Sequence, residues 1–211
     1  MCRLLYVRSK NKFSINDELK KFATISEKSK EFQGHGWGCS YLVNDEWKHY
    51  KNISPIWQDN LEQFEETTLL IVHARSAFQD KDIFVENNMP FYDDKYIFIF
   101  NGELQGVKIK EEGRIGAEKI FNYIKRFDKG DTKDMLAKGV DVIKKKTSYV
   151  RAMNIIITTK ERAYVSSDFS EDPDYFTMSY KKENDKLTIC SVPFEGESDW
   201  IKIENNSVRE F

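Results

Sequence analysis

The sequence predicts a single domain of the α+β class over residues 1–211, with helices packed on mainly antiparallel sheets. Several short runs rich in β-branched and aromatic residues are typical of strands. Most of these runs follow one another without a helix between each consecutive pair, which favours antiparallel over parallel sheets. Other segments repeat apolar residues at helical spacing. No Gly/Ser-rich or Pro-rich stretch interrupts this order, so no linker is predicted.

The predicted strands are distributed along the whole chain. They cover residues 3–7, 37–43, 68–75, 95–101, 152–158, 163–167, 175–181 and 186–192. A chain of 211 residues is long enough to bury one substantial core, although its length also allows two small domains. We favour one domain, with these apolar strands at the centre of its core.

Three helices are predicted from apolar periodicity and from their start signals. The first follows Ser14 to Asp17, which resembles a capping box, and its apolar positions are Ile15, Leu19, Phe22 and Ala23. The second has its apolar positions at Ile120, Phe121, Ile124 and Phe127. The third follows the cap candidates Asp131 and Thr132, with apolar Met135, Leu136, Val140 and Ile143. We interpret these apolar faces as parts of the core.

Charge and apolar run length exclude two classes of partner. The formal net charge is −2, with 33 basic and 35 acidic residues spread along the chain, so no basic surface for nucleic acid is predicted. The longest apolar runs are too short to span a bilayer, and the N-terminus lacks a charged-then-apolar leader. We therefore expect a cytoplasmic protein that binds neither nucleic acid nor a membrane.

The cysteines and histidines do not predict a disulfide framework or a metal site. The three cysteines are Cys2, Cys39 and Cys190, an odd number without CxxC spacing, which suits a reducing compartment. The three histidines, His35, His49 and His73, are isolated from one another in sequence. No metal is expected from these spacings.

Cys2 stands at the exposed end of the chain, directly before an apolar run. A free cysteine often behaves as a small buried hydrophobe, and by position alone that interpretation is favoured. The other interpretation is a reactive nucleophile, which requires partner groups elsewhere in the sequence.

Possible partner groups lie where predicted strands begin or end. In the strand 68–75, side chains alternate, so His73 and Arg75 point to the same side. A guanidinium held by a rigid strand suits a substrate carboxylate, whereas the alternative for Arg75 is a structural ion pair.

Two further segments combine glycine with polar or bulky groups. Asn101 and Gly102 could donate two hydrogen bonds to an oxyanion, although Asn-Gly is also the commonest hairpin turn pair. The segment GHGWG contains Trp37 and Gly38, and it suits either a pocket wall or a hairpin entering the core.

Taken in order, M-C-R-L-L, GWG, H-x-R, N-x-x-P-F and F-N-G-E-L resemble the class II glutamine amidotransferase domain of the N-terminal nucleophile (Ntn) hydrolase superfamily. The chain is most similar to the small stand-alone members, and residues 190–194 and 200–208 resemble the closing strands of the family. The resemblance implies a four-layer α-β-β-α sandwich and an enzyme without a cofactor.

The resemblance also implies a role for each candidate residue. Removal of Met1 would leave Cys2 as an N-terminal nucleophile whose own α-amino group acts as the base, since its usual pKa of about 7.7–8.0 lies near the working pH. Asn101 and the Gly102 N–H would form the oxyanion hole. Arg75 would bind the substrate carboxylate, and His73, Trp37 and Gly38 are the other predicted substrate-binding residues. The substrate would be glutamine or a γ-glutamyl-type amide, and a separate enzyme would receive any transferred ammonia.

Three features depart from the family pattern, and the first is that Ser76, Ala77, Phe78 and Gln79 follow Arg75, unlike in the larger synthetase-linked enzymes. Gly116 stands where an acid that binds the substrate amino group is expected, so either another acid such as Glu111 or Glu112 replaces it, or the substrate is not free glutamine. A retained Met1 would block the base. These features support an alternative function, a catalytically inactive Ntn-fold binding or regulatory subunit. Another amide hydrolysed by the same chemistry is a third hypothesis.

Overall fold

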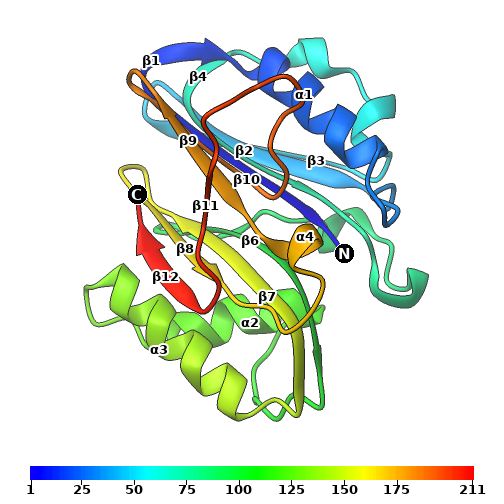
Figure 1. The fold of residues 1–211 in the computed structure, drawn as a ribbon, viewed down its shortest axis with the longest axis vertical. Coiled ribbons are helices and arrows are strands. Elements are labelled where there is room, and N and C mark those ends of the chain that lie inside the picture. The colour runs from blue at the N-terminus through cyan, green and yellow to red at the C-terminus, as the bar shows by residue number, and fades with distance from the viewer. The chain divides into compact units, whose positions relative to one another are not determined.

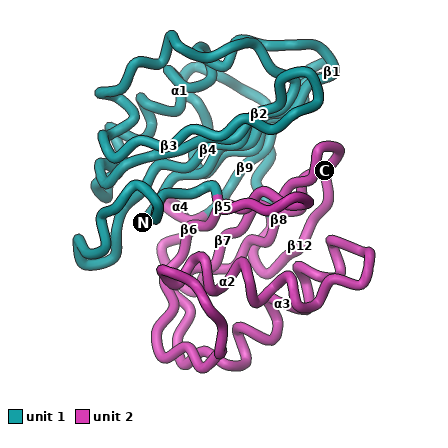
Figure 2. The backbone as a smooth tube through the Cα atoms, turned by 180° about the vertical axis from the view of Figure 1, so that it is seen from behind, with its two compact units in different colours: residues 1–90, 177–203 teal, residues 91–176, 204–211 magenta.

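A computed structural model describes all residues 1–211 and confirms the α+β class, with two antiparallel sheets and a small number of helices (Figure 1). The chain forms two compact units, which Figure 2 shows in different colours. Unit 1 comprises Met1–Pro90 and Thr177–Ile203, and unit 2 comprises Phe91–Phe176 and Glu204–Phe211. Each unit contains one sheet and its own helices.

Unit 1 contains a seven-stranded sheet in the order β11-β9-β10-β1-β4-β2-β3. Its strands are β1 (Arg3–Ser14), β2 (Trp37–Val43), β3 (Glu46–Asn52), β4 (Glu66–Ala74), β9 (Ser179–Glu183), β10 (Lys186–Cys190) and β11 (Ile201–Lys202), and its helix is α1 (Ile15–Glu27). The N-terminal strand β1 lies at the centre, between β10 and β4. The first residues of the chain are therefore held by pairing on both sides.

The core of unit 1 follows from alternation along its strands. Leu5 and Val7 of β1 and Leu70, Val72 and Ala74 of β4 pack against the apolar face of α1. The intervening residues of these strands point to the opposite face of the sheet. Helix α1 begins as the sequence predicts, because the Ser14 side chain accepts a hydrogen bond from the Asp17 N–H.

Unit 2 contains a five-stranded sheet in the order β12-β8-β7-β6-β5. Its strands are β5 (Phe91–Tyr92), β6 (Ile97–Gln105), β7 (Tyr149–Thr158), β8 (Ala163–Ser167) and β12 (Ser207–Glu210), and its helices are α2 (Gly116–Lys125), α3 (Thr132–Lys145) and α4 (Pro173–Phe176). Phe98 of β6 stacks on Phe121 of α2 with ring centroids 5.0 Å apart. Asp131 caps α3 by accepting from the Asp134 N–H, as predicted.

The structure corrects several predicted bounds. The segment predicted as a strand over 175–181 begins as the short helix α4, because the Tyr175 and Phe176 N–H groups both donate to the Asp172 carbonyl, and β9 starts only at Ser179. The closing strands were predicted over residues 190–194 and 200–208. In the structure, β10 already ends at Cys190, and β11 has only two residues. The edge strand β3 was not predicted, since its exposed, polar sequence lacks the apolar alternation of a half-buried strand. No helix is both long enough and apolar enough to cross a membrane.

Candidate functional site

Strand pairing in unit 1 brings the N-terminus beside the end of β4. Arg3 lies opposite Ala74 and Leu4 opposite His73 in the β1–β4 ladder, so the same register extended by one residue sets Cys2 beside Arg75. Two contacts to Ser76 agree with this placement. The Ser76 N–H donates to Cys2 Sγ at 3.4 Å, and the thiol donates to the Ser76 carbonyl at 3.6 Å.

The three thiols differ in exposure and in acidity. Burial raises the pKa of the Cys2 thiol, while the N-terminal ammonium, the Ser76 hydrogen bond and Arg75 act to lower that pKa. Cys39 and Cys190 have no exposed surface, and burial raises the pKa of Cys190 to about 12 and that of Cys39 still further. Cys2 is partly exposed and has a cation nearby, so it is the thiol best placed to react.

Arg75 is a buried cation with neutral partners. Its backbone is fixed just beyond β4, where its N–H donates to the Gly36 carbonyl at 2.9 Å and its carbonyl accepts from the His35 N–H at 3.1 Å. Its guanidinium donates to the Asp82 carbonyl at 2.9 Å and to Asn88 Oδ1 at 3.5 Å.

The Arg75 guanidinium forms no ion pair, so the alternative of a structural ion pair does not describe it. Arg75 as a residue is only 5% exposed, and burial lowers the pKa of its guanidinium. A guanidinium has five N–H donors, and neutral oxygens accept from two of these. An uncompensated buried charge with unused donors is suited to an anionic ligand.

A hydrogen-bonded network supports the partners of Arg75. Asn88 Nδ2 donates to the Asn52 carbonyl at 2.8 Å, and Asn52 Nδ2 donates to Asp59 Oδ2 at 2.7 Å. Gly36 lies against this network with φ +103°, and a Cβ at that position would come within 2.2 Å of Asn88 Nδ2. Glycine is therefore required here both by the backbone conformation and by the close approach of Asn88.

The structure places the other predicted residues of unit 1 on different sides of the sheet. Trp37 is fully buried in the core cluster that contains α1, and its indole N–H donates to Asp59 Oδ2 at 2.9 Å. The sequence left two interpretations of GHGWG, a pocket wall and a hairpin that enters the core. The buried position of Trp37 fits the second interpretation. Gly38 pairs with His73, which is fully buried and alternates with Val72 and Ala74 of the α1-facing core.

In unit 2, Asn101 and Gly102 lie inside β6 and pair with Asn154 and Met153 of β7, so they do not form a hairpin turn. A Cβ on Gly102 would approach the Ala152 carbonyl to 2.3 Å, which explains the glycine. Asn101 is fully buried, and neither its side-chain oxygen nor its nitrogen has a hydrogen-bond partner. Leaving such a group unpaired costs about 1–3 kcal/mol, and a water molecule or a ligand that pairs with the Asn101 amide would offset this cost.

Two of the acids near the start of α2 have local partners, and a third is exposed. Gly116 opens the helix with free space around its Cα, so no acid occupies the expected position. Glu111 pairs with Arg126 at 3.6 Å, and Glu118 accepts from the Arg114 N–H at 2.6 Å. Glu112 is exposed.

The segment after Arg75 forms contacts that the sequence did not predict. The Ala77 N–H donates to His35 Nδ1 at 2.9 Å, and His35 Nε2 lies 3.5 Å from Asp80 Oδ1. Burial lowers the pKa of His35 despite this acid, so its ring is neutral near pH 7. Asp82 and Asn88 contact Arg75 only because the segment folds back, a long-range feature that local patterning does not contain.

Met1 is held at the N-terminus by two side chains. Its ammonium pairs with the Glu31 carboxylate, and Gln33 Nε2 donates to its carbonyl. In this form the nitrogen of Cys2 belongs to an amide, which has no basic lone pair. The chain with Met1 in place therefore lacks the predicted base.

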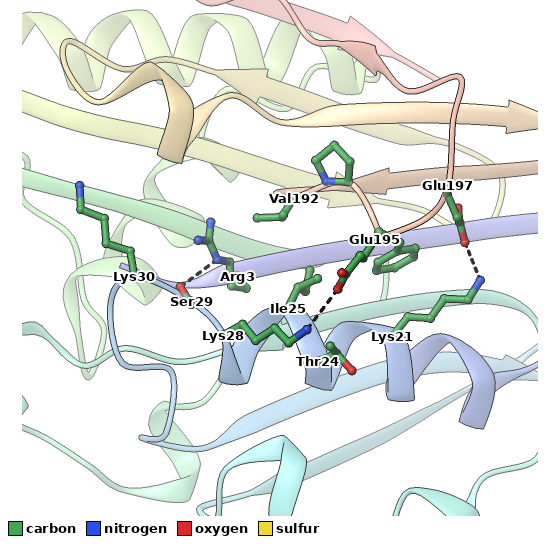
Figure 3. A pocket seen from close by; sticks show the side chains of 12 residues that line it. Arg3, Lys21, Thr24, Ile25, Lys28, Ser29, Lys30, Val192, Glu195 and Glu197 are labelled. Carbon is green, nitrogen blue, oxygen red and sulfur yellow. Dashed lines mark hydrogen bonds and ion pairs between the residues drawn. The ribbon is translucent and has the colours of Figure 1, made fainter.

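A surface pocket of about 380 Å³ lies elsewhere in unit 1, between α1 and residues 192–197 (Figure 3). Two ion pairs cross it, Lys28 to Glu195 at 3.1 Å and Lys21 to Glu197 at 2.8 Å. Neither Cys2 nor Arg75 lines it. We regard it as an ion-paired surface hollow that is separate from the predicted site residues.

Solved structures share this fold across nearly the whole chain. A glutamine aminotransferase class-II domain protein from Silicibacter pomeroyi is 13% identical with a TM-score of 0.69, over 99% of this chain and 94% of that one. A predicted glutamine amidotransferase from Pseudomonas aeruginosa is 14% identical with a TM-score of 0.63, over 100% and 97% of the two chains.

A third neighbour, glutamine phosphoribosylpyrophosphate amidotransferase from B. subtilis, is 17% identical with a TM-score of 0.62, over 90% of this chain but 42% of that one. No family model matches the sequence, and no curated protein matches it. At these identities the likeness establishes the fold, and it confirms the sequence resemblance at that level.

Proposed function

Because the chain has the fold of class II glutamine amidotransferase domains, we propose that it is an amidohydrolase with Cys2 as its N-terminal nucleophile. Its substrate is glutamine or a γ-glutamyl-type amide, and its active form lacks Met1. The proposed unit of function is the whole chain as a single domain without a cofactor, acting in the cytoplasm. A separate ammonia-accepting enzyme is its proposed partner where ammonia is transferred.

The observation that carries this proposal is the state of Arg75. Its guanidinium is buried, has no acidic partner and lies beside Cys2 in the extended β1–β4 register. A carboxylate that binds there supplies the missing counter-charge through two parallel hydrogen bonds. A substrate held by its carboxylate next to a thiol has its amide presented for nucleophilic attack.

The proposed reaction proceeds through a thioester. The Cys2 α-amine takes the thiol proton as Sγ attacks the amide carbon, and the resulting oxyanion is assigned to Asn101 and the Gly102 N–H. The ammonium returns the proton to the leaving nitrogen, and ammonia departs as the C–N bond breaks. Water then attacks the thioester, the amine accepts its proton, and collapse releases the carboxylic acid and restores the thiol.

Hydrolysis by protein that lacks Met1 tests the proposal directly. We expect release of one ammonia and one glutamate per glutamine, with intact mass used to verify that Met1 is absent. Protein that retains Met1 serves as the control and is expected to be inactive, because its Cys2 nitrogen is an amide. Absence of turnover with glutamine and with a panel of γ-glutamyl amides would refute the enzyme proposal.

We expect Asn101→Ala to lower kcat by about 10²- to 10³-fold, because one oxyanion donor is lost. KM should change little, since the carboxylate-binding Arg75 is intact. The unpaired Asn101 amide supports this prediction, because its removal leaves no partner group unsatisfied. Steady-state kinetics check it, and a variant with unchanged kcat would exclude Asn101 from the oxyanion hole.

One observation favours a second candidate function, a catalytically inactive Ntn-fold binding or regulatory subunit. Glu31 and Gln33 hold both ends of Met1, which stabilises the chain with its nucleophile blocked. Intact mass of protein from its native host separates the two functions. Loss of one methionine supports the enzyme, and quantitative retention supports the inactive subunit.

A further inference from the structure

Asn88 is a fully buried residue whose side-chain amide contacts Arg75 and a backbone carbonyl at the same time. Its Nδ2 donates to the Asn52 carbonyl at 2.8 Å, and its Oδ1 accepts from Arg75 Nη1 at 3.5 Å. Its backbone N–H donates to the Val85 carbonyl at 3.1 Å, which holds the residue at the end of a short turn. Asn88 therefore connects the guanidinium to the end of strand β3 at Asn52.

The two partners of the Asn88 amide determine its orientation. A backbone carbonyl accepts hydrogen bonds and cannot donate them, so the Asn52 carbonyl requires the NH2 end of the amide. A guanidinium only donates, so Arg75 requires the oxygen end. Both partners select the same orientation, because a flipped amide would place two acceptors together at one end and two donors together at the other.

The Asn52 end of this connection is anchored in the core of unit 1. Asn52 Nδ2 donates to Asp59 Oδ2 at 2.7 Å. The same carboxylate oxygen accepts from Trp37 Nε1 and from the Tyr50 hydroxyl, both at 2.9 Å. Trp37 is fully buried in the core cluster, so the residue whose carbonyl orients Asn88 is tied to the rigid part of the unit.

Asn88 holds the guanidinium without neutralising it. An aspartate has nearly the same size and shape, and at this position it would give Arg75 an internal counter-charge. The neutral amide oxygen forms only a long hydrogen bond, at 3.5 Å. A ligand carboxylate forms shorter and stronger charge-assisted bonds, so it outcompetes the amide for the guanidinium. The positive charge of Arg75 thus stays available to an anion.

We infer that Asn88 is a positioning residue for the carboxylate site at Arg75. Its fixed amide oxygen orients the guanidinium, and its neutrality keeps the positive charge unpaired until an anion binds. This inference rests on the proposed function, because it takes the anion that binds Arg75 to be the carboxylate of the substrate.

The test measures glutamine binding by calorimetry in Cys2→Ala protein without Met1, which binds without turnover. We expect Asn88→Asp to raise the Kd at least about 100-fold, because the new carboxylate competes with the ligand for the guanidinium. Asn88→Leu has a similar volume and no polar group. It should raise the Kd only about 10-fold, because the guanidinium loses its orientation and keeps its charge. A purely structural role predicts the opposite order, since aspartate retains more of the native contacts than leucine.

The matched control is Gln79→Glu, which makes the same amide-to-acid change at an exposed position of the same segment. It should change the Kd less than about two-fold, and thermal unfolding verifies that each variant is folded. An unchanged Kd in Asn88→Asp, or a loss in Asn88→Leu that equals or exceeds it, overturns the inference. If Asn88→Asp does not fold, Asn88→Leu decides alone, and an unchanged Kd in that variant overturns the inference.

Steady-state kinetics separate the failure of this inference from that of the proposed function. In protein with Cys2 intact and Met1 removed, Asn88→Asp should raise KM for glutamine and change kcat less than about two-fold, because Asn88 acts on binding through Arg75. Hydrolysis of glutamine with an unchanged KM in that variant removes the inference and leaves the enzyme. Glutamine binding that Asn88→Asp weakens as expected, in a protein that does not hydrolyse glutamine, supports the inference and removes the enzyme.

Discussion

Replacement of Cys2 by alanine, in protein that lacks Met1, is expected to reduce glutamine hydrolysis by at least about 10⁴-fold, because loss of the nucleophile removes the covalent route. The fold should be unaffected, since Cys2 precedes β1 and its thiol forms two weak hydrogen bonds, both to Ser76. Ammonia release and thermal unfolding are measured on the same samples.

A glutamine-analogue electrophile provides an independent measurement of the same role. We expect one equivalent to label Cys2 and inactivate the enzyme. Cys39 and Cys190 should stay unlabelled, because both are buried and their pKa values are raised far above neutral pH. Peptide mass mapping identifies the labelled thiol. Labelling that spares Cys2, or full activity in Cys2→Ala, would contradict its assignment as the nucleophile.

Replacement of Arg75 by alanine should raise KM for glutamine by about 10²- to 10³-fold, since a desolvated charge pair with the substrate carboxylate is lost. Arg75→Lys should recover only part of this affinity, because a lysine ammonium lacks the planar fork that binds a carboxylate through two bonds. Steady-state kinetics measure KM and kcat for both variants.

The control for Arg75 is an electrophile without a carboxylate. Alkylation of Cys2 by iodoacetamide should proceed at a similar rate in the wild type and in Arg75→Lys, which keeps the positive charge beside the thiol. An Arg75→Ala enzyme with unchanged KM would show that the substrate carboxylate binds elsewhere. A KM increase accompanied by a large fall in melting temperature would instead indicate that the Asp82 and Asn88 contacts of Arg75 hold the fold.

Local sequence patterns predicted most elements because alternation and capping are short-range properties. The strands Trp37–Val43 and Ala163–Ser167 were predicted with their observed bounds, and α1 begins after the predicted cap Ser14. Strands that form because of their neighbours were predicted less accurately. The polar edge strand β3 exists because it pairs with β2, and its own composition does not indicate a strand.

The candidate site also has a part that the sequence predicted and a part that it did not. The sequence indicated Cys2, Arg75 and Asn101 because each combines a reactive or polar group with the beginning or end of an apolar run. It left open whether Asn101 and Gly102 form a turn, and whether Trp37 lines a pocket. Pairing with β7 decided the first question, and packing with α1 decided the second.

The sequence by itself determined which candidate reactive groups this chain has: a thiol at position 2, a guanidinium at a strand end and an Asn-Gly pair, all identified from residue type and local position. Only the tertiary structure decided which of these groups lack partners. Arg75 has the neutral oxygens of Asp82 and Asn88 as partners instead of an acid, because residues 76–88 fold back onto the end of β4. That fold-back depends on contacts between distant residues, which local periodicity does not specify.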